Sequence, residues 1–171
     1  MNKKLILLIL FFGITNFQLN AEMNIAYIDM DIILNKSNPG LKIIKTIDKI
    51  KNKSEKMMLK IENDLKKKEN VLMTQKNILN KNDFDDKLIK FRSEVNKYKI
   101  KKQNESKFVR DNYVKMNSAL IKNIQPLLVD YVKSKDITFL LQKKNIILGA
   151  SEFDITDDVI KIINKNIKVI K

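Results

Sequence analysis

The chain has 171 residues, of which 44% are hydrophobic, and its formal net charge at pH 7 is +14. This length is typical of one domain, or of one body with an extension. The sequence contains no Cys and no His, which excludes disulfides and the usual zinc ligands and removes the commonest general base near neutral pH. With three Gly residues, a glycine-rich phosphate-binding loop is hard to build. The composition therefore predicts a protein that is not an enzyme and that binds no cofactor.

The positive charge is concentrated in the middle of the chain. Residues 41–135 hold 25 Lys and Arg against 12 Asp and Glu, a net charge of +13. Only Arg92 and Arg110 are arginine. Lysine acts as a point charge, whereas arginine offers a planar fork that fits base edges and phosphates. The preference for lysine therefore favours diffuse electrostatic attraction over sequence-specific recognition of nucleic acid. A general compositional bias towards Ile, Lys and Asn is an alternative explanation for the lysine excess.

The first residues have the layout of a secretory signal peptide. Lys3 and Lys4 precede an apolar run over residues 5–14, and Ala21 supplies a small residue for cleavage. The run is shorter than the roughly 20 residues that a membrane span needs, although an uncleaved anchor is the alternative. We therefore expect residues 1–21 to be removed, so that the mature protein begins near Glu22 and lies outside the cytoplasm.

Residues 41–135 predict two long helices folded back on each other near residues 80–85. Apolar residues recur every seven positions in the first helix and at spacings of four and three in the second, which is the pattern of antiparallel coiled-coil packing. A second stripe on the first helix, which we call the companion stripe, is apolar at Ile47 and Ile61 and becomes polar at Lys68 and Gln75. We therefore expect the apolar seam between the two helices to narrow towards the tip of the hairpin. The main stripes consist of Met58, Leu65, Leu72 and Leu79 in the first helix and of Phe84, Leu88, Phe91, Val95 and Tyr98 in the second.

The turn between these helices contains three aspartates, Asp83, Asp85 and Asp86. Asp83 is predicted to cap the second helix by accepting hydrogen bonds from free backbone N–H groups. A calcium site is the alternative, but a calcium loop needs more oxygen ligands and a glycine at its turn. No metal site is therefore predicted here.

Large apolar side chains on the hairpin have two possible roles. Phe84, Phe91 and Tyr98 lie on the stripe at helical spacing, where a place in the seam is the commoner role and a ligand-binding surface is the alternative. Ile100 and Phe108 lie off the main stripe and are therefore better candidates for contact with a bound partner. All five residues are candidate binding residues.

The segments on either side of the hairpin, residues 22–40 and 136–171, predict one small body. Short apolar runs over residues 25–28, 137–142 and 146–150 suit strands, and the last two runs are spaced for a β-hairpin.

Helices and a turn complete this body. Residues 30–36 suit a short helix, residues 37–40 have strong turn chemistry, and the acidic residues at 154–158 suit the start of a final helix. The predicted fold class is α+β, a small β-containing body with a long antiparallel coiled-coil helical hairpin over residues 41–135.

The two ends of the chain resemble the Skp/OmpH family of periplasmic chaperones. The opening carries Ile25-Ala26-Tyr27-Ile28-Asp29 and then Ile33-Leu34-Asn35-x-Ser37, and the ending carries Leu148-x-Ala150-Ser151-x-x-Asp154-Ile155-Thr156-Asp157-x-Val159-Ile160. The order of signal, strand, helical hairpin, two strands and final helix also matches. Gly149 departs from the family pattern, in which an aromatic residue is frequent.

The resemblance implies a homotrimer. Strands from three copies would form a central body, from which three hairpins hang like tentacles around a cavity. The residues implied in this trimer body are Ile25, Tyr27, Ile28, Phe139, Leu140, Ile146 and Leu148.

The resemblance also implies a function, that of a periplasmic holdase chaperone that keeps unfolded outer-membrane proteins soluble. Its partners would be these client proteins and further copies of itself. Anionic lipid surfaces are a further candidate partner. Two alternatives are a structural coiled-coil protein of the envelope and a nucleic-acid-binding protein, the latter suggested by the pI of about 9.8. The signal peptide, the scarcity of Arg and the lack of a base-reading motif count against nucleic acid as a partner.

Overall fold

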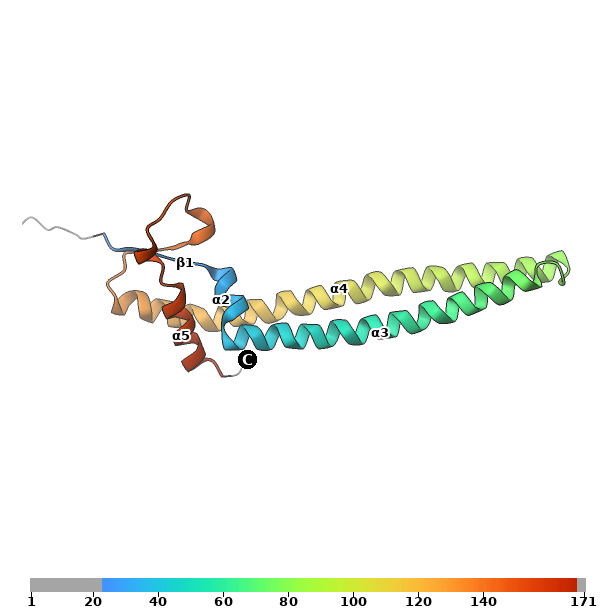
Figure 1. The fold of residues 1–171 in the computed structure, drawn as a ribbon, viewed down its shortest axis with the longest axis horizontal. Helices are drawn as coiled ribbons and strands as arrows, with labels where there is room; N and C mark the ends of the chain where they lie inside the picture. The colour runs from blue at the N-terminus through green and yellow to red at the C-terminus, as the bar shows by residue number, and fades with distance from the viewer. Residues whose placement is uncertain (1–22, 169–171) are drawn as a thin grey trace, which may run out of the picture.

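The computed structural model describes residues 23–168, in which a long helical hairpin projects from a small body (Figure 1). The predicted signal peptide, residues 1–21, lies outside the described residues. The predicted α+β class is confirmed. The elements are β1 (Ile25–Ile28), α2 (Met30–Lys36), α3 (Asn38–Gln75), α4 (Lys81–Ser134), β2 (Phe139–Gln142), the 3-10 turns η1 (Lys143–Asn145) and η2 (Ser151–Phe153), and α5 (Thr156–Asn166).

The two strands form a parallel sheet, in which Ile25 lies opposite Phe139 and Ile28 lies opposite Gln142. Parallel strands cannot be joined by a tight turn and need a crossover connection. Here α2 and the entire α3–α4 hairpin form that crossover, so the hairpin starts and ends at the same small sheet.

The prediction of a third strand over residues 146–150 is wrong for the described chain. These residues form a loop, in which Ile147 and Leu148 are 98% and 91% exposed. The predicted β-hairpin does not form: β2 is followed by the 3-10 turn η1, and in the sheet β2 pairs with β1 alone. The Tyr27 hydroxyl instead donates to the Ala150 carbonyl at 3.1 Å, and a Cβ on Gly149 would lie 3.1 Å from the Tyr27 ring. A glycine at position 149 therefore lets the loop lie against Tyr27.

The junction between α2 and α3 is tighter than the turn predicted over residues 37–40. The chain leaves the helical conformation only at Ser37, whose hydroxyl accepts from the N–H of Gly40 at 3.3 Å and whose own N–H donates to the Ile33 carbonyl at 3.1 Å. One residue thus caps both helices. Pro39 lies in the first turn of α3, where its missing N–H costs nothing. Of the turn predicted over residues 37–40, only Ser37 is non-helical, and residues 38–40 already belong to α3.

The distal turn is capped by Asn80 rather than by Asp83. The Asn80 side chain accepts from the N–H of Asp83 at 3.0 Å and also donates to the Asp83 carboxylate at 2.7 Å. Asn80 has the extended backbone that a cap requires, whereas Asp83 lies in the first turn of α4, where its negative charge suits the helix dipole.

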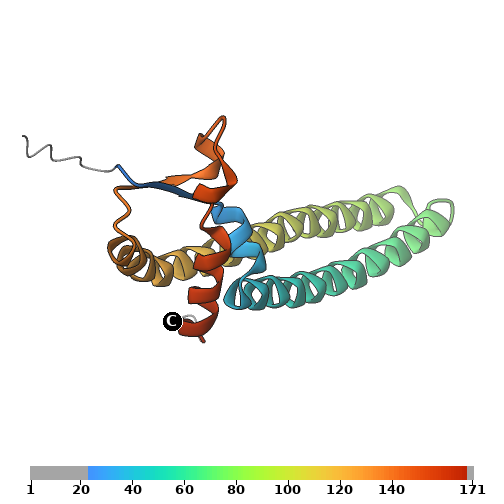
Figure 2. The same ribbon diagram turned by 60° about the vertical axis from the view of Figure 1, so that its left-hand side comes forward.

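The main core lies where the base of the hairpin crosses the body (Figure 2). It takes residues from one strand and four helices, so the body has no core separate from the hairpin base. Pro126 lies inside α4 near this core, and the helix continues to Ser134. The core residues are Ile28, Ile33, Ile43, Leu120, Ile124, Val159, Ile163 and Ile167.

Asp154 and Thr156 join the start of α5 to the sheet. Thr156 donates its N–H to the Asp154 carboxylate at 3.0 Å, and its hydroxyl accepts from the N–H of Asp29 at 2.8 Å. Burial would raise the pKa of Asp154, but hydrogen bonds from Thr156 and Lys143 outweigh it and hold the pKa below its usual value. Thr156 is itself buried, so these bonds give Asp154 and Thr156 of the Asp-Ile-Thr-Asp segment a structural role.

The end of α4 has Asp136 in the left-handed region, with φ of 51°. The N–H of Ile137 donates to the Val132 carbonyl at 3.0 Å and that of Asp136 to the Lys133 carbonyl at 3.4 Å. This pattern is a Schellman motif, in which the left-handed position is usually Gly because other residues meet a steric penalty there.

Replacing Gly40 with Ala should destabilise the protein by roughly 3 kcal/mol, because its Cβ would lie 1.8 Å from the Leu34 carbonyl oxygen. Urea denaturation followed by circular dichroism measures the change. Gly149→Ala, with its smaller overlap, is the control and should cost less. Gly→Ala inside a helix ordinarily stabilises by about 1 kcal/mol, so a stabilised Gly40→Ala protein would contradict this close approach.

Replacing Asp136 with Gly should stabilise the protein by about 0.5–1 kcal/mol, because Gly adopts the left-handed conformation without steric cost. Thermal and urea unfolding of the two proteins measure the difference. Lys135→Gly is the matched control and should destabilise, because Lys135 has a φ of −111° and gains nothing from Gly. A loss of stability in Asp136→Gly would show that the Asp side chain has a role beyond the turn.

Candidate functional site

The α3–α4 seam contains a series of polar bridges between the two helices. Along this series the residue numbers rise in α3 as they fall in α4, so the bridges lock the antiparallel register. They alternate with apolar layers in which Met58 and Leu72 are buried and Leu65 is half-buried. The bridges run from Ser54 to Glu105 (2.8 Å), Tyr98 to Glu62 (2.9 Å), Lys68 to Glu94 (2.6 Å) and Lys87 to Gln75 (2.8 Å).

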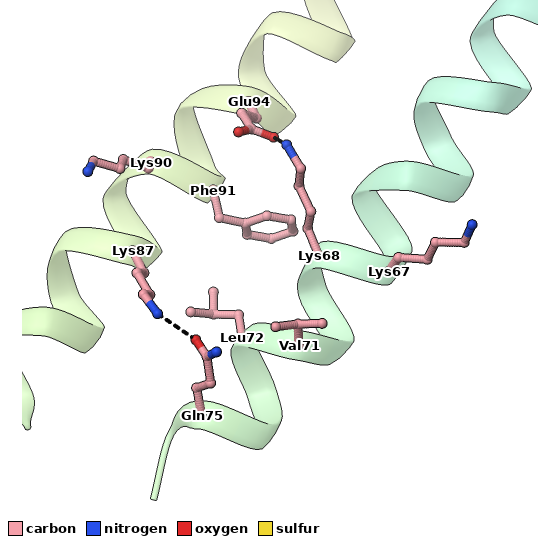
Figure 3. Close-up of a pocket in the computed structure, with 9 residues that line it drawn as sticks. All are labelled: Lys67, Lys68, Val71, Leu72, Gln75, Lys87, Lys90, Phe91 and Glu94. Carbon is pink, nitrogen blue, oxygen red and sulfur yellow. Dashed lines mark hydrogen bonds and ion pairs between the residues drawn. The ribbon is translucent and has the colours of Figure 1, made fainter. Parts of the chain in front are cut away.

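The polar companion stripe predicted at Lys68 and Gln75 has a structural consequence. Long polar side chains at these positions reach across to α4 instead of filling the space between the helices. A cleft of about 400 Å³ is left there, which we call the distal cleft (Figure 3). Its lining residues are Lys67, Lys68, Val71, Leu72, Gln75, Lys87, Lys90, Phe91 and Glu94.

Phe91 points from α4 across the distal cleft towards α3, where Leu72 and Val71 lie below its ring (Figure 3). Leu72 is buried, whereas Val71 is 54% exposed and forms an open edge. The cleft thus combines an apolar floor with a rim of four lysines and one glutamate.

The five candidate binding residues fall into two groups. Phe84, Phe91 and Tyr98 are half-buried along the seam. Ile100 and Phe108 are 49% and 54% exposed, away from the seam. Phe84 and Tyr98 therefore pack in the seam, and Phe91 lies at the distal cleft. Ile100 and Phe108 lie on the open surface of the hairpin.

Tyr98 shows how tightly a seam aromatic is held. Its hydroxyl donates to Glu62 at 2.9 Å, and the Lys102 ammonium lies 5.8 Å from the centre of its ring. The hydrogen bond to Glu62 is the main reason why the pKa of Tyr98 is raised above its ordinary value. Neighbouring side chains of the hairpin therefore hold both the hydroxyl and the ring of Tyr98.

The structure also shows an apolar stripe that our sequence analysis missed. Ile89, Ile100, Val114 and Ile121 are all exposed on α4. Their spacings of 11, 14 and 7 residues are close to whole numbers of helical turns, so they share one face of the helix, turned away from α3. That periodicity was the available signal, and the stronger seam pattern on the same helix obscured it. We call these four residues the outer stripe.

The residues implied in a trimer body also divide by burial. Tyr27 and Ile28 are buried inside their own chain, and Leu140 and Ile146 are half-buried. Of the residues implied in a trimer body, Ile25, Phe139 and Leu148 are exposed, and the sequence analysis did not single out Ile147, which is exposed as well.

Among residues 23–168, no group of three or more His, Cys, Asp and Glu side chains could hold a metal ion. None of the helices in this range is both long enough and apolar enough to cross a membrane. The described hairpin surface presents lysines, exposed apolar side chains and clefts with mixed apolar and charged linings, of which the distal cleft is one.

Comparison with solved structures identifies the same architecture in an OmpH-like protein from Caulobacter crescentus CB15. The two proteins share 16% sequence identity and superpose with a TM-score of 0.77 over 86% of this chain and 88% of the other. At this identity the likeness concerns the fold. A comparison with curated proteins found no match.

The family-level comparison covers nearly the whole of the described chain. The family model described as outer membrane protein (OmpH-like) matches residues 24–163, from before β1 to well inside α5. The match includes both chain ends on which the resemblance to the Skp/OmpH chaperones rested. This protein belongs to the OmpH-like family.

Proposed function

We propose that this protein is a periplasmic holdase chaperone that binds unfolded outer-membrane proteins and keeps them soluble. Membership in a family of outer membrane chaperones supports a chaperone role. The observation that carries the finer proposal is the surface of the hairpin, where exposed apolar side chains are scattered among lysines over a segment of net charge +13. Such a surface provides many weak contacts and no sequence-specific one.

The two kinds of side chain have different tasks in this mechanism. Lysines attract acidic segments of an unfolded chain over distances of the order of the Debye length, which raises the rate of encounter. Exposed apolar residues such as Ile100 and Phe108 then retain the client by burying apolar surface. The signal peptide predicted over residues 1–21 supports a periplasmic location for this activity. The same lysines make anionic lipid surfaces a second partner.

Self-association is the second part of the proposal. A two-stranded sheet is marginally stable by itself, and the loop over residues 146–150 presents two almost fully exposed apolar side chains, Ile147 and Leu148. Ile25 and Phe139, opposite each other in the sheet, are also exposed. We propose that these side chains are covered by two further copies, which makes the body the centre of a homotrimer with the hairpins directed away from it.

We predict that the mature protein suppresses aggregation when a denatured outer-membrane β-barrel protein is diluted out of urea. Stopped-flow association should slow as salt rises from about 0.01 to 0.3 M, because the Debye length falls below about 10 Å. Replacing Ile100 and Phe108 with Ser should instead raise the client's dissociation rate roughly tenfold. Light scattering that is the same with and without the protein would favour the alternative of a purely structural coiled coil.

We predict that the double substitution Ile147→Asp and Leu148→Asp dissociates the trimer. Multi-angle light scattering should give three times the chain mass for the parent protein and one chain mass for the variant. Circular dichroism should be unchanged, because both side chains are exposed within the single chain. Ile78→Asp, at an exposed position near the hairpin tip, is the control and should remain trimeric. A variant that kept the parent mass would rule out the loop as an assembly surface.

A further inference from the structure

The distal cleft is an open groove between α3 and α4, and a polar bridge between the helices lies at each of its two ends. Along α3 it runs from Lys68 to Gln75, and along α4 from Lys87 to Glu94. The Lys68–Glu94 pair closes one end at 2.6 Å and the Lys87–Gln75 hydrogen bond closes the other at 2.8 Å (Figure 3). Seven residues separate the two bridges on each helix, which is about 10 Å along the axis.

The floor of the cleft is apolar, and its rim is positively charged. Phe91, Leu72 and Val71 supply the apolar surface, and the four lysines against Glu94 leave a net charge of +3. Glu94 is already paired with Lys68, and the contact of Lys87 is with a neutral amide. Within the described chain, Lys67 and Lys90 have no carboxylate within ion-pair distance, and they extend to opposite sides of the cleft (Figure 3).

The length, the apolar floor and the lysine rim of the distal cleft indicate the size and charge of the group that fits it. The apolar floor between the two bridges has room for one or two side chains, and an acyl chain laid along the groove would meet the bridges at both ends. The flanking lysines favour carboxylates on either side of the inserted group. Resting on the chaperone function proposed above, we infer that the distal cleft binds a short unfolded segment in which an aromatic side chain is flanked by Asp or Glu.

This assignment makes the cleft a preferred docking point on an otherwise unselective surface. The client's aromatic ring lies against Phe91 and Leu72, entering past the exposed Val71. Its neighbouring carboxylates face Lys67 and Lys90. Because the backbone groups of α3 and α4 are bonded within their helices, recognition runs through side chains alone and tolerates many sequences around the aromatic residue.

The absence of Trp from the chain permits a direct test with the full mature protein. Titration with the peptide acetyl-Gly-Asp-Trp-Asp-Gly-amide should give a saturable blue shift of the peptide's fluorescence and protection of its Trp from acrylamide. The matched peptide with Lys in place of Asp should not bind. If both peptides bind equally, or neither binds, the inference is wrong.

Variants of the cleft locate the site. The pair Lys67→Glu and Lys90→Glu should weaken binding at least about tenfold, and Val71→Phe, which fills the cleft from its open edge, at least about fivefold. The control pair Lys45→Glu and Lys115→Glu changes the net charge equally at exposed hairpin positions elsewhere and should weaken binding less than about threefold. Circular dichroism and thermal unfolding verify that all variants fold.

Three outcomes would overturn the inference. The first is an equal loss in the cleft pair and the control pair, which would indicate diffuse attraction; the second is unchanged binding in Val71→Phe. The third is that the protein does not bind the peptide but sediments with phosphatidylglycerol vesicles, and that the Lys67→Glu and Lys90→Glu pair abolishes this sedimentation. That result would assign the cleft to lipid. In each of these cases, undiminished suppression of barrel aggregation would leave the proposed chaperone function standing.

Discussion

The shared core at the base of the hairpin is the contact on which the rest of this fold depends. Ile33, Leu120, Ile124 and Ile163 are fully buried there, and they come from α2, α4 and α5. Ile43 adds the start of α3. Because the strands are short and only two, burial of these side chains, at roughly 25 cal/mol per Å² of apolar surface, is the main force that joins the hairpin to the body. The tight junction at Ser37 and Gly40 serves the same core, since it brings α2 and α3 into contact.

Away from that core, polar bridges between α3 and α4 replace much of the buried apolar contact. Past Ser54 the seam has few fully buried side chains, and hydrogen bonds between α3 and α4 recur among its apolar layers. Exposed or half-buried bridges of this kind contribute little stability each, but they fix the register of the two helices. A seam built in this way leaves apolar side chains on the outer face of α4 and an open cleft between the helices. Both are surfaces that a tightly packed coiled coil would not offer.

Much of the architecture was predictable because its signals are local and periodic. The sevenfold stripe through Met58 and Leu72 predicted the coiled coil, and its polar companions at Lys68 and Gln75 predicted a narrowing seam. The errors occurred where one residue decides between neighbouring possibilities: Asn80 caps α4 instead of Asp83, and α3 begins before Gly40 instead of after it. Hydrogen bonds between residues a few positions apart decide where such a helix begins. The spacing of apolar residues does not reveal these hydrogen bonds.

By itself the sequence determined the succession of first strand, helical hairpin and final helix, the concentration of lysine in the hairpin, and the resemblance of the two ends to the OmpH-like family. Each of these is a property of residue type and spacing along the chain. Only the tertiary structure decided that β1 and β2 are parallel, that residues 146–150 form an exposed loop, and that Phe91 lies at a cleft while Tyr98 is held by Glu62. These outcomes depend on which partners meet across more than a hundred residues of intervening chain or across the α3–α4 seam. The pairing energy of such contacts is not encoded in any local stretch, so it becomes visible only when the chain is folded.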